Sequence, residues 1–357
     1  MSDTFTIGID GEQLPARKGE TVLQVARRGG IHIPTLCADD RLDAAGCCRA
    51  CLVEIDGQRR LQPSCAWQAT PNMNVKSHSP RVQRHRETLL AMYMADHKLG
   101  ADGLPIHTTQ GNELRNWALE TPHKKLTPVH SPRKGRVEDL NPYISFDPEL
   151  CVVCAKCTRY CDEIEAVNAI TLTLRGSETT IATHGERGLL DTTCELCGGC
   201  IDVCPTGAMH AKQTPRFLQP EEITKVRTTC NYCGVGCQID LNVHKGKIVQ
   251  VTAPPVGETV NDGNLCVKGR FAYNFVHHEQ RLTTPMIRGA DGELHPATWE
   301  EAITFAAKGL LRIKDQHGPH ALGFVSSSRC TNEENYLVQK LARAAFGTNN
   351  VHQCAAT

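Results

Sequence analysis

Residues 151–161 read CVVCAKCTRYC and residues 194–204 read CELCGGCIDVC, so eight cysteines fall into two quartets with the same spacing. Each quartet follows C-x2-C-x2-C-x3-C, and a proline follows the second. Thiolates separated by two residues wrap one loop around three corners of a cubic iron-sulfur cluster, while the fourth cysteine points toward the other cluster. The expected ligand sets therefore cross over. One [4Fe-4S] cluster is expected on Cys151, Cys154, Cys157 and Cys204, and another on Cys194, Cys197, Cys200 and Cys161.

Structural zinc and disulfide bonds are the alternatives for these cysteines. Structural zinc sites use paired rather than tripled C-x2-C units, and disulfides need an oxidising compartment. The spacing is that of the bacterial two-cluster ferredoxins. Residues 143–216 are therefore expected to form a small α+β ferredoxin domain that carries a short-stranded insertion at 169–182.

The composition sets bounds on the whole chain. Its 357 residues, 40% of them hydrophobic, are enough for two or more packed domains. Lys plus Arg and Asp plus Glu are equal at 39 each, so no net charge recruits nucleic acid or an anionic membrane. No signal sequence and no run of roughly 18 apolar residues is present. We therefore expect a cytoplasmic chain with no membrane span, whose partners are proteins and small molecules.

The cysteine count supports metal ligation. Nineteen cysteines is an odd and high number for a cytoplasmic chain, which favours metal ligands over disulfide pairs. Sixteen of them form four quartets, and Cys47, Cys330 and Cys354 are left over.

Residues 1–78 are predicted to form another cluster-binding domain. Alternating apolar residues at 5–9, a turn at Asp10-Gly11 and a second strand at 13–17 indicate a hairpin, and a helix follows that ends at Gly29-Gly30. A third quartet with the spacing C-x10-C-x2-C-x13-C comes next and comprises Cys37, Cys48, Cys51 and Cys65. Cys47 is the alternative to Cys48, but the loop requires the Cys48-x2-Cys51 pairing, so Cys47 is expected to be a bystander.

This order of hairpin, helix and ligand loop resembles the N-terminal [2Fe-2S] β-grasp domain of respiratory NADH dehydrogenases, iron-only hydrogenases and NAD-linked formate dehydrogenases. The resemblance implies one [2Fe-2S] cluster on the third quartet. In these families the following helix leads to an Asp-His pair and three cysteines that bind a further [4Fe-4S] cluster. Residues 79–119 keep the helical pattern and Asp96-His97, but Ala101 and Leu104 stand where cysteines are expected. We expect a helical, degenerate region in which neither His97 nor His107 binds a metal.

Loss of that cluster affects the predicted electron route. Residues 120–142 form a polar linker interrupted by prolines. The [2Fe-2S] centre is expected either to lie close to the two-cluster ferredoxin or to serve a separate branch toward a partner.

Residues 225–285 contain the fourth quartet, C-x2-C-x3-C followed after 28 residues by one more cysteine: Cys230, Cys233, Cys237 and Cys266. A zinc ribbon is the alternative. The segment 261–271, NDGNLCVKGRF, resembles the N-terminal [4Fe-4S] domain of molybdenum or tungsten bis(pterin guanine dinucleotide) oxidoreductases, most closely formate dehydrogenases. By that resemblance Lys268 lies between the cluster and the pterin, where a buried cation favours passage of an electron. The alternative is a surface lysine.

Residues 286–357 predict the incomplete start of an α/β domain. A capping box at Thr298 and Glu301 begins a helix, and a strand at 321–326, a helix at 332–346 and a strand from Val351 follow. This β-α-β alternation indicates a parallel sheet.

Taken together, the motifs predict a multidomain α+β chain and resemble the N-terminal portion of the α subunit of a cytoplasmic NAD-linked formate dehydrogenase. The resemblance implies formate oxidation to CO2, with electrons passed through one [2Fe-2S] and three [4Fe-4S] clusters to an NAD-reducing partner. It also implies molybdenum- or tungsten-bis(molybdopterin guanine dinucleotide) in the complete protein, and flavin/NAD-binding and small iron-sulfur subunits as partners. The alternatives are a non-catalytic subunit like the large iron-sulfur subunit of NADH dehydrogenase, and a nitrate reductase.

In the resembling formate dehydrogenases a strand reading roughly NVDxCARV precedes the cysteine or selenocysteine that binds the metal. Residues 350–357 here read NVHQCAAT. The expectation is that the gene continues through an in-frame UGA selenocysteine codon, with a fragmentary gene record and a naturally split subunit as alternatives. No catalytic residue is expected within the chain, and the 357-residue product is expected to lack formate oxidation.

Overall fold

The computed structural model describes residues 4–123 and 139–354, so most of the predicted linker lies outside the described residues. The described residues form two compact units. One comprises residues up to Lys225 together with Asn242–Thr252 and Asn264–Val267, and the other comprises Val226–Leu241, Ala253–Gly263 and the residues from Lys268.

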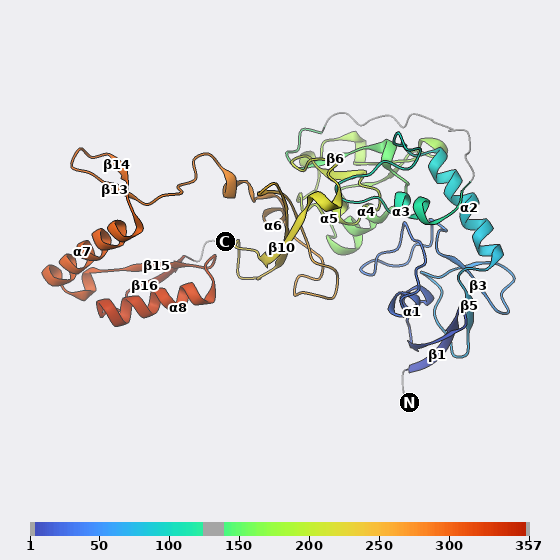
Figure 1. Ribbon diagram of the computed structural model, residues 1–357, viewed down its shortest axis with the longest axis horizontal. Helices are drawn as coiled ribbons and strands as arrows, with labels where there is room; N and C mark the ends of the chain where they lie inside the picture. The colour runs from blue at the N-terminus through green and yellow to red at the C-terminus, as the bar shows by residue number, and fades with distance from the viewer. Residues whose placement is uncertain (1–3, 124–138, 355–357) are drawn as a thin grey trace. The chain divides into compact units, whose positions relative to one another are not determined.

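The N-terminal domain is built on a five-stranded sheet in the order β2-β1-β5-β3-β4 (Figure 1). Its elements are β1 (Thr4–Ile9), β2 (Glu12–Arg17), α1 (Val22–Arg28), β3 (Leu52–Ile55), β4 (Gln62–Pro63) and β5 (Asn74–Lys76). β1 pairs antiparallel with β2 and parallel with β5. The predicted hairpin and helix are confirmed, and Asp10 and Gly11 take the positive φ angles that a tight turn between antiparallel strands requires.

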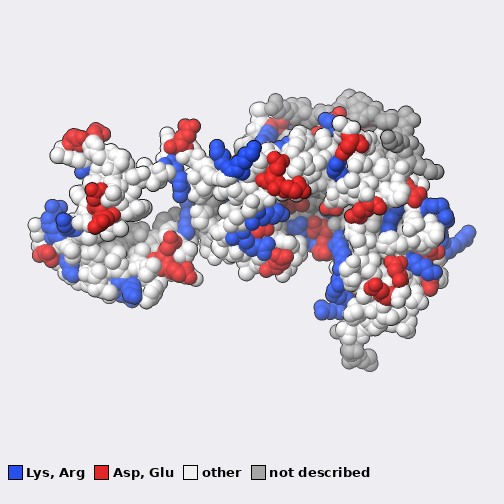
Figure 2. All heavy atoms as spheres, in the orientation of Figure 1, with Lys and Arg blue, Asp and Glu red and all other residues white. Residues whose placement is uncertain are grey.

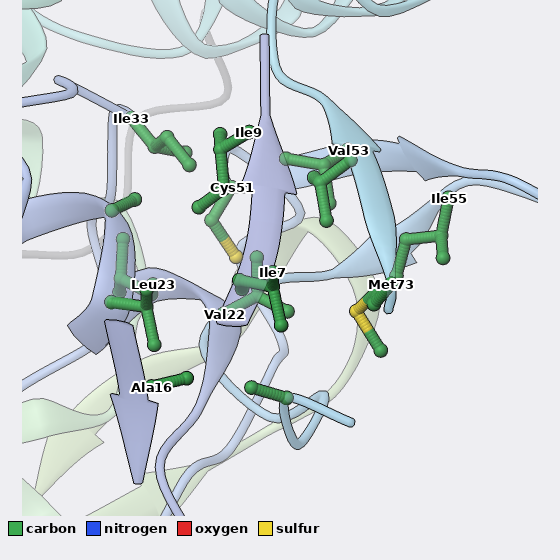
Figure 3. Close-up of a cluster of buried hydrophobic side chains, with 14 of the residues drawn as sticks. Ile7, Ile9, Ala16, Val22, Leu23, Ile33, Cys51, Val53, Ile55 and Met73 are labelled. Atoms are coloured by element: carbon green, nitrogen blue, oxygen red, sulfur yellow. The ribbon is translucent and has the colours of Figure 1, made fainter. Parts of the chain in front are cut away.

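The core of this domain lies between the sheet and α1. Ile7, Ile9 and Val22 are fully buried, and Cys51 projects into the same cluster from the residue before β3 (Figure 3). Cys65 belongs to the same cluster, so two of the third quartet's cysteines are fixed by the hydrophobic core itself.

Two helices follow, α2 (Pro80–Ala95) and α3 (Glu113–Glu120). The Ser79 hydroxyl caps α2, and proline at the first helical position supports the start. α2 confirms the predicted helix, whereas α3 was not predicted. Asn112 caps α3, whose residues Leu114 and Trp117 are buried.

The ferredoxin segment contains β6 (Ile144–Phe146), which pairs antiparallel with β9 (Met209–Ala211). Each quartet loop leads into one turn of helix, α4 (Lys156–Arg159) or α5 (Gly199–Asp202). A π-helical segment, Tyr160–Ile164, extends the first of these helices. The predicted insertion is a short hairpin of β7 (Thr171–Thr173) and β8 (Thr180–Ala182).

Beyond the ferredoxin segment a three-stranded sheet has the order β10-β11-β12. Its strands are β10 (Thr224–Thr229), β11 (Gln238–His244) and β12 (Lys247–Thr252), and α6 (Val267–Phe271) follows. The pair β11 and β12 matches the strands that the sequence predicted around Lys245-Gly246.

The C-terminal segment has a hairpin that was not predicted, β13 (Met286–Arg288) with β14 (Leu294–Pro296). It continues through α7 (Trp299–His317), β15 (Phe324–Ser327), α8 (Asn332–Lys340) and β16 (Val351–Cys354). The capping box at Thr298 forms as predicted, and β15 pairs in parallel with β16. β15 starts later than predicted because Pro319–Ala321 forms a 3-10 turn. None of the residues of α7 is buried.

Charged side chains of both signs are interspersed on the surface. Figure 2 shows Lys and Arg alternating with Asp and Glu over the face in view, in keeping with 39 basic and 39 acidic residues in the sequence. A mixed surface of this kind gives no strong attraction to a polyanion.

Candidate functional site

None of the cysteines whose side chains the structure describes forms a disulfide bond. We call Cys37, Cys48, Cys51 and Cys65 the N-terminal site. Cys151, Cys154, Cys157 and Cys204 are the first ferredoxin site, and Cys161, Cys194, Cys197 and Cys200 are the second ferredoxin site.

The N-terminal site is enclosed by the β-grasp domain, and its four cysteines are between 1% and 6% exposed. Thiols of Cys47, Cys48 and Cys65 donate hydrogen bonds to the Cys37 sulfur, which lowers the pKa of Cys37. A hydrogen bond from Cys65 lowers the pKa of Cys51 to about 7 despite its burial. The structure therefore brings together the four sulfurs that the spacing predicted.

Cys47 lies beside the N-terminal site but differs from Cys48 in exposure. Cys48 is 3% exposed, whereas Cys47 is exposed to solvent. Both thiols contact the Cys37 sulfur, so contact alone does not select the ligand. The choice of Cys48 stays a prediction, supported by its burial.

The first ferredoxin site combines three cysteines of one loop with Cys204 of the other. Burial raises the pKa of Cys154 to about 11, and Cys204 is the charged neighbour that acts on it most strongly. Cys157 is buried, and the charges of Cys154, Cys151 and Cys204 add to the burial that raises its pKa. These thiols hold their protons until a metal displaces them, because ligation requires the thiolate.

The second ferredoxin site surrounds a cavity of about 300 Å3. Its wall includes all four cysteines of the crossed set, Cys161, Cys194, Cys197 and Cys200. Burial raises the pKa of Cys194, and Cys161 is the sulfur that acts on it most strongly. The structure thus groups both ferredoxin sets in the crossed manner that the sequence predicted. Their occupation by iron and sulfide stays a prediction.

Backbone N–H groups point at the sulfurs of both loops. Val153 N lies 3.3 Å from Cys151 Sγ, and Leu196 N lies 3.4 Å from Cys194 Sγ. Val153 and Leu196 both adopt left-handed backbone with φ near 55°, which costs about 1–2 kcal/mol in a residue with a side chain. Hydrogen bonds to ligand sulfurs favour the thiolate and help to set cluster potentials.

The N-terminal site and the first ferredoxin site are in direct contact. Arg159 Nη2 donates to the Cys37 carbonyl at 2.5 Å, and Cys47 Sγ donates to the Cys154 carbonyl at 3.5 Å. Leu36 and Val152, neighbours of ligands from the two loops, belong to one buried apolar cluster. The sequence left open whether the N-terminal site lies close to the two-cluster ferredoxin or serves a separate branch toward a partner. In the structure the N-terminal site lies close to the ferredoxin segment.

The degenerate region supports this contact. Its helix α2 reaches the N-terminal site, where Tyr93 Oη donates to the Cys48 carbonyl at 3.1 Å. Its helix α3 reaches the ferredoxin segment, where Glu113 N donates to the Pro205 carbonyl at 2.7 Å. The region therefore links the two ligand-bearing domains structurally.

The two histidines of this region make backbone contacts. His97 Nδ1 lies 2.8 Å from the Lys98 carbonyl, and His107 Nε2 lies 2.8 Å from the Leu218 carbonyl. Among residues 4–123 and 139–354, no group of three His, Cys, Asp or Glu side chains is placed to hold a single metal ion. A polynuclear cluster spreads its ligands over several irons, so this finding bears on mononuclear sites such as zinc.

The fourth quartet is divided between the two compact units. Cys230, Cys233 and Cys237 belong to one unit, in which Cys230 N donates to the Cys237 carbonyl at 2.8 Å and closes the loop. Cys266 belongs to the other unit and is exposed. Lys268 in α6 is also exposed, so the described residues do not supply the burial that its predicted role needs. Its pterin contact stays a prediction.

Sequence reasoning missed a polar contact beside the second ferredoxin site. Tyr160, in the cavity wall, donates from Oη to Asn264 Oδ1 at 2.7 Å, and Asn264 lies two residues before Cys266. The Arg41 guanidinium lies 5.3 Å from the centre of the Tyr160 ring. The sequence feature that could have indicated this contact is Tyr160, an aromatic residue directly before Cys161. The second quartet has Val203 at the corresponding position, directly before Cys204.

Four family models match the chain in order. They are a 2Fe-2S iron-sulfur cluster binding domain at residues 2–80, a ferredoxin-like domain of NADH-quinone oxidoreductase subunit 3 at 141–210, a molybdopterin oxidoreductase Fe4S4 domain at 223–278 and a molybdopterin oxidoreductase domain at 281–357. Residues 223–357 are therefore similar to two successive domains of molybdopterin oxidoreductases, and residues 2–80 and 141–210 are similar to iron-sulfur domains. This series of domains confirms the predicted fold class.

Two similar proteins are themselves subunits. NADPH-Fe(3+) oxidoreductase subunit alpha of Geobacter sulfurreducens (strain ATCC 51573 / DSM 12127 / PCA) is 34% identical over 97% of this chain and 40% of its own length. An NADH-quinone oxidoreductase subunit of Rhizobium meliloti (strain 1021) is 35% identical over 97% of this chain and 39% of its own length. The chain thus spans about two fifths of the length of these relatives.

A solved structure is similar to part of the chain. The crystal structure of NAD+-reducing [NiFe]-hydrogenase in the H2-reduced state matches with a TM-score of 0.53 and 29% identity, over 60% of this chain and 90% of that chain. No helix among residues 4–123 and 139–354 is long and apolar enough to cross a membrane.

Proposed function

We propose that this chain carries electrons within a formate dehydrogenase, between a molybdopterin centre and an NAD-reducing flavin partner. The observation that carries the electron-transfer part is the contact between the N-terminal and first ferredoxin sites. Cys47 and Cys154 meet there, and Arg159 holds the Cys37 carbonyl. Electron tunnelling weakens steeply with distance, so adjoining ligand loops are the arrangement that such a relay needs.

The residues fit the clusters that the relay requires. Four cysteines converge at the N-terminal site in a buried pocket, as a [2Fe-2S] cluster needs. The 300 Å3 cavity of the second ferredoxin site is lined by its four cysteines and by apolar residues such as Ile170. We assign one [2Fe-2S] cluster to the N-terminal site and one [4Fe-4S] cluster to each ferredoxin site and to the fourth quartet.

The clusters supply one-electron steps, and the protein sets their order and exposure. Arg159 fixes the approach of the first two sites, and the N–H groups of Val153 and Leu196 favour the thiolate forms of their ligands. At the other end, Tyr160 and Asn264 connect the second ferredoxin site to the segment that carries Cys266. The proposed relay therefore runs from the fourth quartet through the ferredoxin sites to the N-terminal site.

Formate as the substrate rests on the sequence around Cys266 and on one further relative. A Staphylococcus aureus (strain USA300) protein, provisionally named a formate dehydrogenase, is 28% identical over 99% of this chain and 39% of its own length. Molybdenum or tungsten would be held by the molybdopterin of the complete protein. By the same reasoning the partners are flavin/NAD-binding and small iron-sulfur subunits.

The second candidate is a subunit that transfers electrons without substrate chemistry of its own, like the large iron-sulfur subunit of NADH dehydrogenase. Sequence identity favours this candidate. The relatives named as NADPH-Fe(3+) and NADH-quinone oxidoreductase subunits are 34% and 35% identical to this chain, whereas the relative named for formate is 28% identical. Metal analysis of the complex isolated from its source separates the two. Molybdenum or tungsten together with formate-dependent dye reduction supports the dehydrogenase, whereas zero for both metals rejects it. Nitrate-dependent oxidation of a reduced dye would instead identify a nitrate reductase.

A further inference from the structure

A buried arginine lies next to the N-terminal site and takes no part in the contacts described so far. Arg86 is on the inward face of α2, one turn after Val82 and one turn before Leu90, and it is 5% exposed. Its Nε and Nη2 atoms are buried and have no hydrogen-bond partner among the described residues. Burying a charge without a partner is strongly unfavourable, so this position requires an anion that compensates it.

The surroundings of α2 place that anion at the N-terminal site. α2 packs against β3, which begins at the residue after Cys51. Leu90, one turn beyond Arg86, belongs to the buried cluster that includes Cys37 and Cys48. His85, the residue before Arg86, lies with Nε2 3.1 Å from the Arg49 carbonyl in the same ligand loop. The helix is thus anchored to the loop that carries the site on both sides of Arg86.

The charges that act on Arg86 agree with this placement. Burial lowers the pKa of Arg86 to about 10, opposed first by Cys51 and then by Asp10. The Asp10 carboxylate is already bound, since it accepts hydrogen bonds from the Ser77 N–H and hydroxyl and lies 3.3 Å from the His78 ring. The group that can still balance Arg86 is the anionic centre on Cys51.

We propose that the Arg86 guanidinium is the charge partner of the N-terminal [2Fe-2S] centre and raises its reduction potential. The inference rests on the proposed function, because it takes the four cysteines to hold that cluster. A [2Fe-2S] cluster on four thiolates is an anion, and the one electron that arrives from its redox partner adds a further negative charge. A fixed cation in a medium of low dielectric constant stabilises the reduced form more than the oxidised form. Arg86 acts on the cluster through its fixed positive charge and does not bond to iron.

The test is an EPR-monitored redox titration of the full chain with its clusters in place. Arg86→Gln should make reduction of the N-terminal cluster about tenfold less favourable, which is a midpoint about 59 mV lower for a one-electron couple. The midpoints of the other clusters should not change. Arg86→Lys keeps the charge and should stay close to the unsubstituted protein. Arg84→Gln is the matched control, because Arg84 is exposed on the same helix.

The outcomes separate the inference from the proposal on which it rests. An unchanged midpoint in Arg86→Gln would reject the role of Arg86 and leave the cluster assignment intact. If Arg86→Gln does not accumulate as loaded protein, Arg86→Met, which also removes the charge, is compared with Arg86→Lys: a midpoint lowered only in Arg86→Met supports the role, and equal midpoints reject it. If the unsubstituted protein shows no [2Fe-2S] signal, the proposed function fails first.

Discussion

The two quartet loops of the ferredoxin segment have the same cysteine spacing, and in each a residue with left-handed backbone, Val153 or Leu196, lies between the first two ligands. The two loops nevertheless face different neighbours. The first loop is followed by Arg159 and Tyr160, which reach the N-terminal site and Asn264. The corresponding residues after the second loop are Asp202 and Val203, and Val203 is 1% exposed, as an ordinary core residue. A repeated motif therefore fixes what is bound, and the residues between the third and fourth cysteines decide which way each site connects.

The largest effect is expected when the fourth cysteine of a ferredoxin site, which the other loop supplies, is removed. With one [2Fe-2S] and three [4Fe-4S] clusters we expect about 14 iron atoms per chain. Cys204→Ser should lower this to about 10 and remove the EPR signal of the first ferredoxin site, because Cys204 completes that site from the other loop. Cys161→Ser should do the same for the second site.

The identity of the lost cluster is the decisive readout, and Cys330, which belongs to none of the four quartets, provides a control in the variant Cys330→Ser. If Cys204→Ser removes the cluster of its own loop instead, the crossed assignment is wrong. An iron content of about 18 in the unsubstituted protein would show that the His97 region binds a cluster after all.

The N-terminal site gives the next prediction. Cys48→Ser should abolish the [2Fe-2S] signal, because its buried thiol contacts the Cys37 sulfur from within the core. Cys47→Ser should leave the signal in place, since Cys47 is exposed. EPR and visible absorption of the reduced proteins measure both effects, and the reverse pattern would transfer the ligand role to Cys47.

Arg159→Ala tests the asymmetry between the loops directly. The variant loses hydrogen bonds at 2.5 Å to the carbonyls of Cys37 and Asp43. We expect unfolding in denaturant to become easier by about 1–3 kcal/mol. Reduction of the N-terminal cluster through the ferredoxin sites should also be slower, as followed by rapid-freeze EPR.

Arg175→Ala, at an exposed position of the insertion, is the matched control and should change neither quantity. If Arg159→Ala loses stability but keeps the rate of electron transfer, Arg159 stabilises the packing of the domains without setting the distance between the N-terminal and first ferredoxin sites.

The smallest predicted effect concerns how the stability of the folded chain depends on pH. His210 lies in β9 after the second loop, where burial, and to a lesser degree the charge of Arg216, lowers its pKa below the usual 6.5. The unfolded chain therefore binds a proton at this position at a higher pH than the folded chain does. Stability should fall as the pH drops through about 6.5 toward the lower folded value. His210→Gln should flatten this slope in denaturant unfolding between pH 7.5 and 5.5, and an unchanged slope would contradict the assignment.

The local patterns of the chain allowed much of the fold to be predicted. Strand alternation and the Asp10-Gly11 turn identified the first hairpin, and the capping box at Thr298 identified the start of α7. The spacing also predicted the grouping of Cys204 with the first loop, and in the structure Cys204 acts on Cys154. These features depend on residues close in sequence or on a motif whose geometry is fixed by the cluster.

The features that were missed depend on distant partners. Arg159 and Cys37 lie 122 positions apart, and no pattern in either segment indicates the other. The helical pattern predicted α2, and Val82 and Leu90 are buried on its inward face. Arg86 lies between them, and a charged residue is not assigned to a core unless its partner is known. α3 was missed because it has eight residues and depends on the Asn112 cap and the burial of Trp117.

The close packing of Gly199 against Tyr160 limits how the ferredoxin segment could be rebuilt. A Cβ atom at position 199 would lie 1.9 Å from Tyr160 Cε1, so any side chain there would displace the ring. The corresponding residue of the first loop is Lys156. A chimera that replaced the second loop with a copy of the first would therefore drive a lysine into the tyrosine, even though every ligand would be retained. The two halves of the repeat have become complementary parts that are no longer interchangeable.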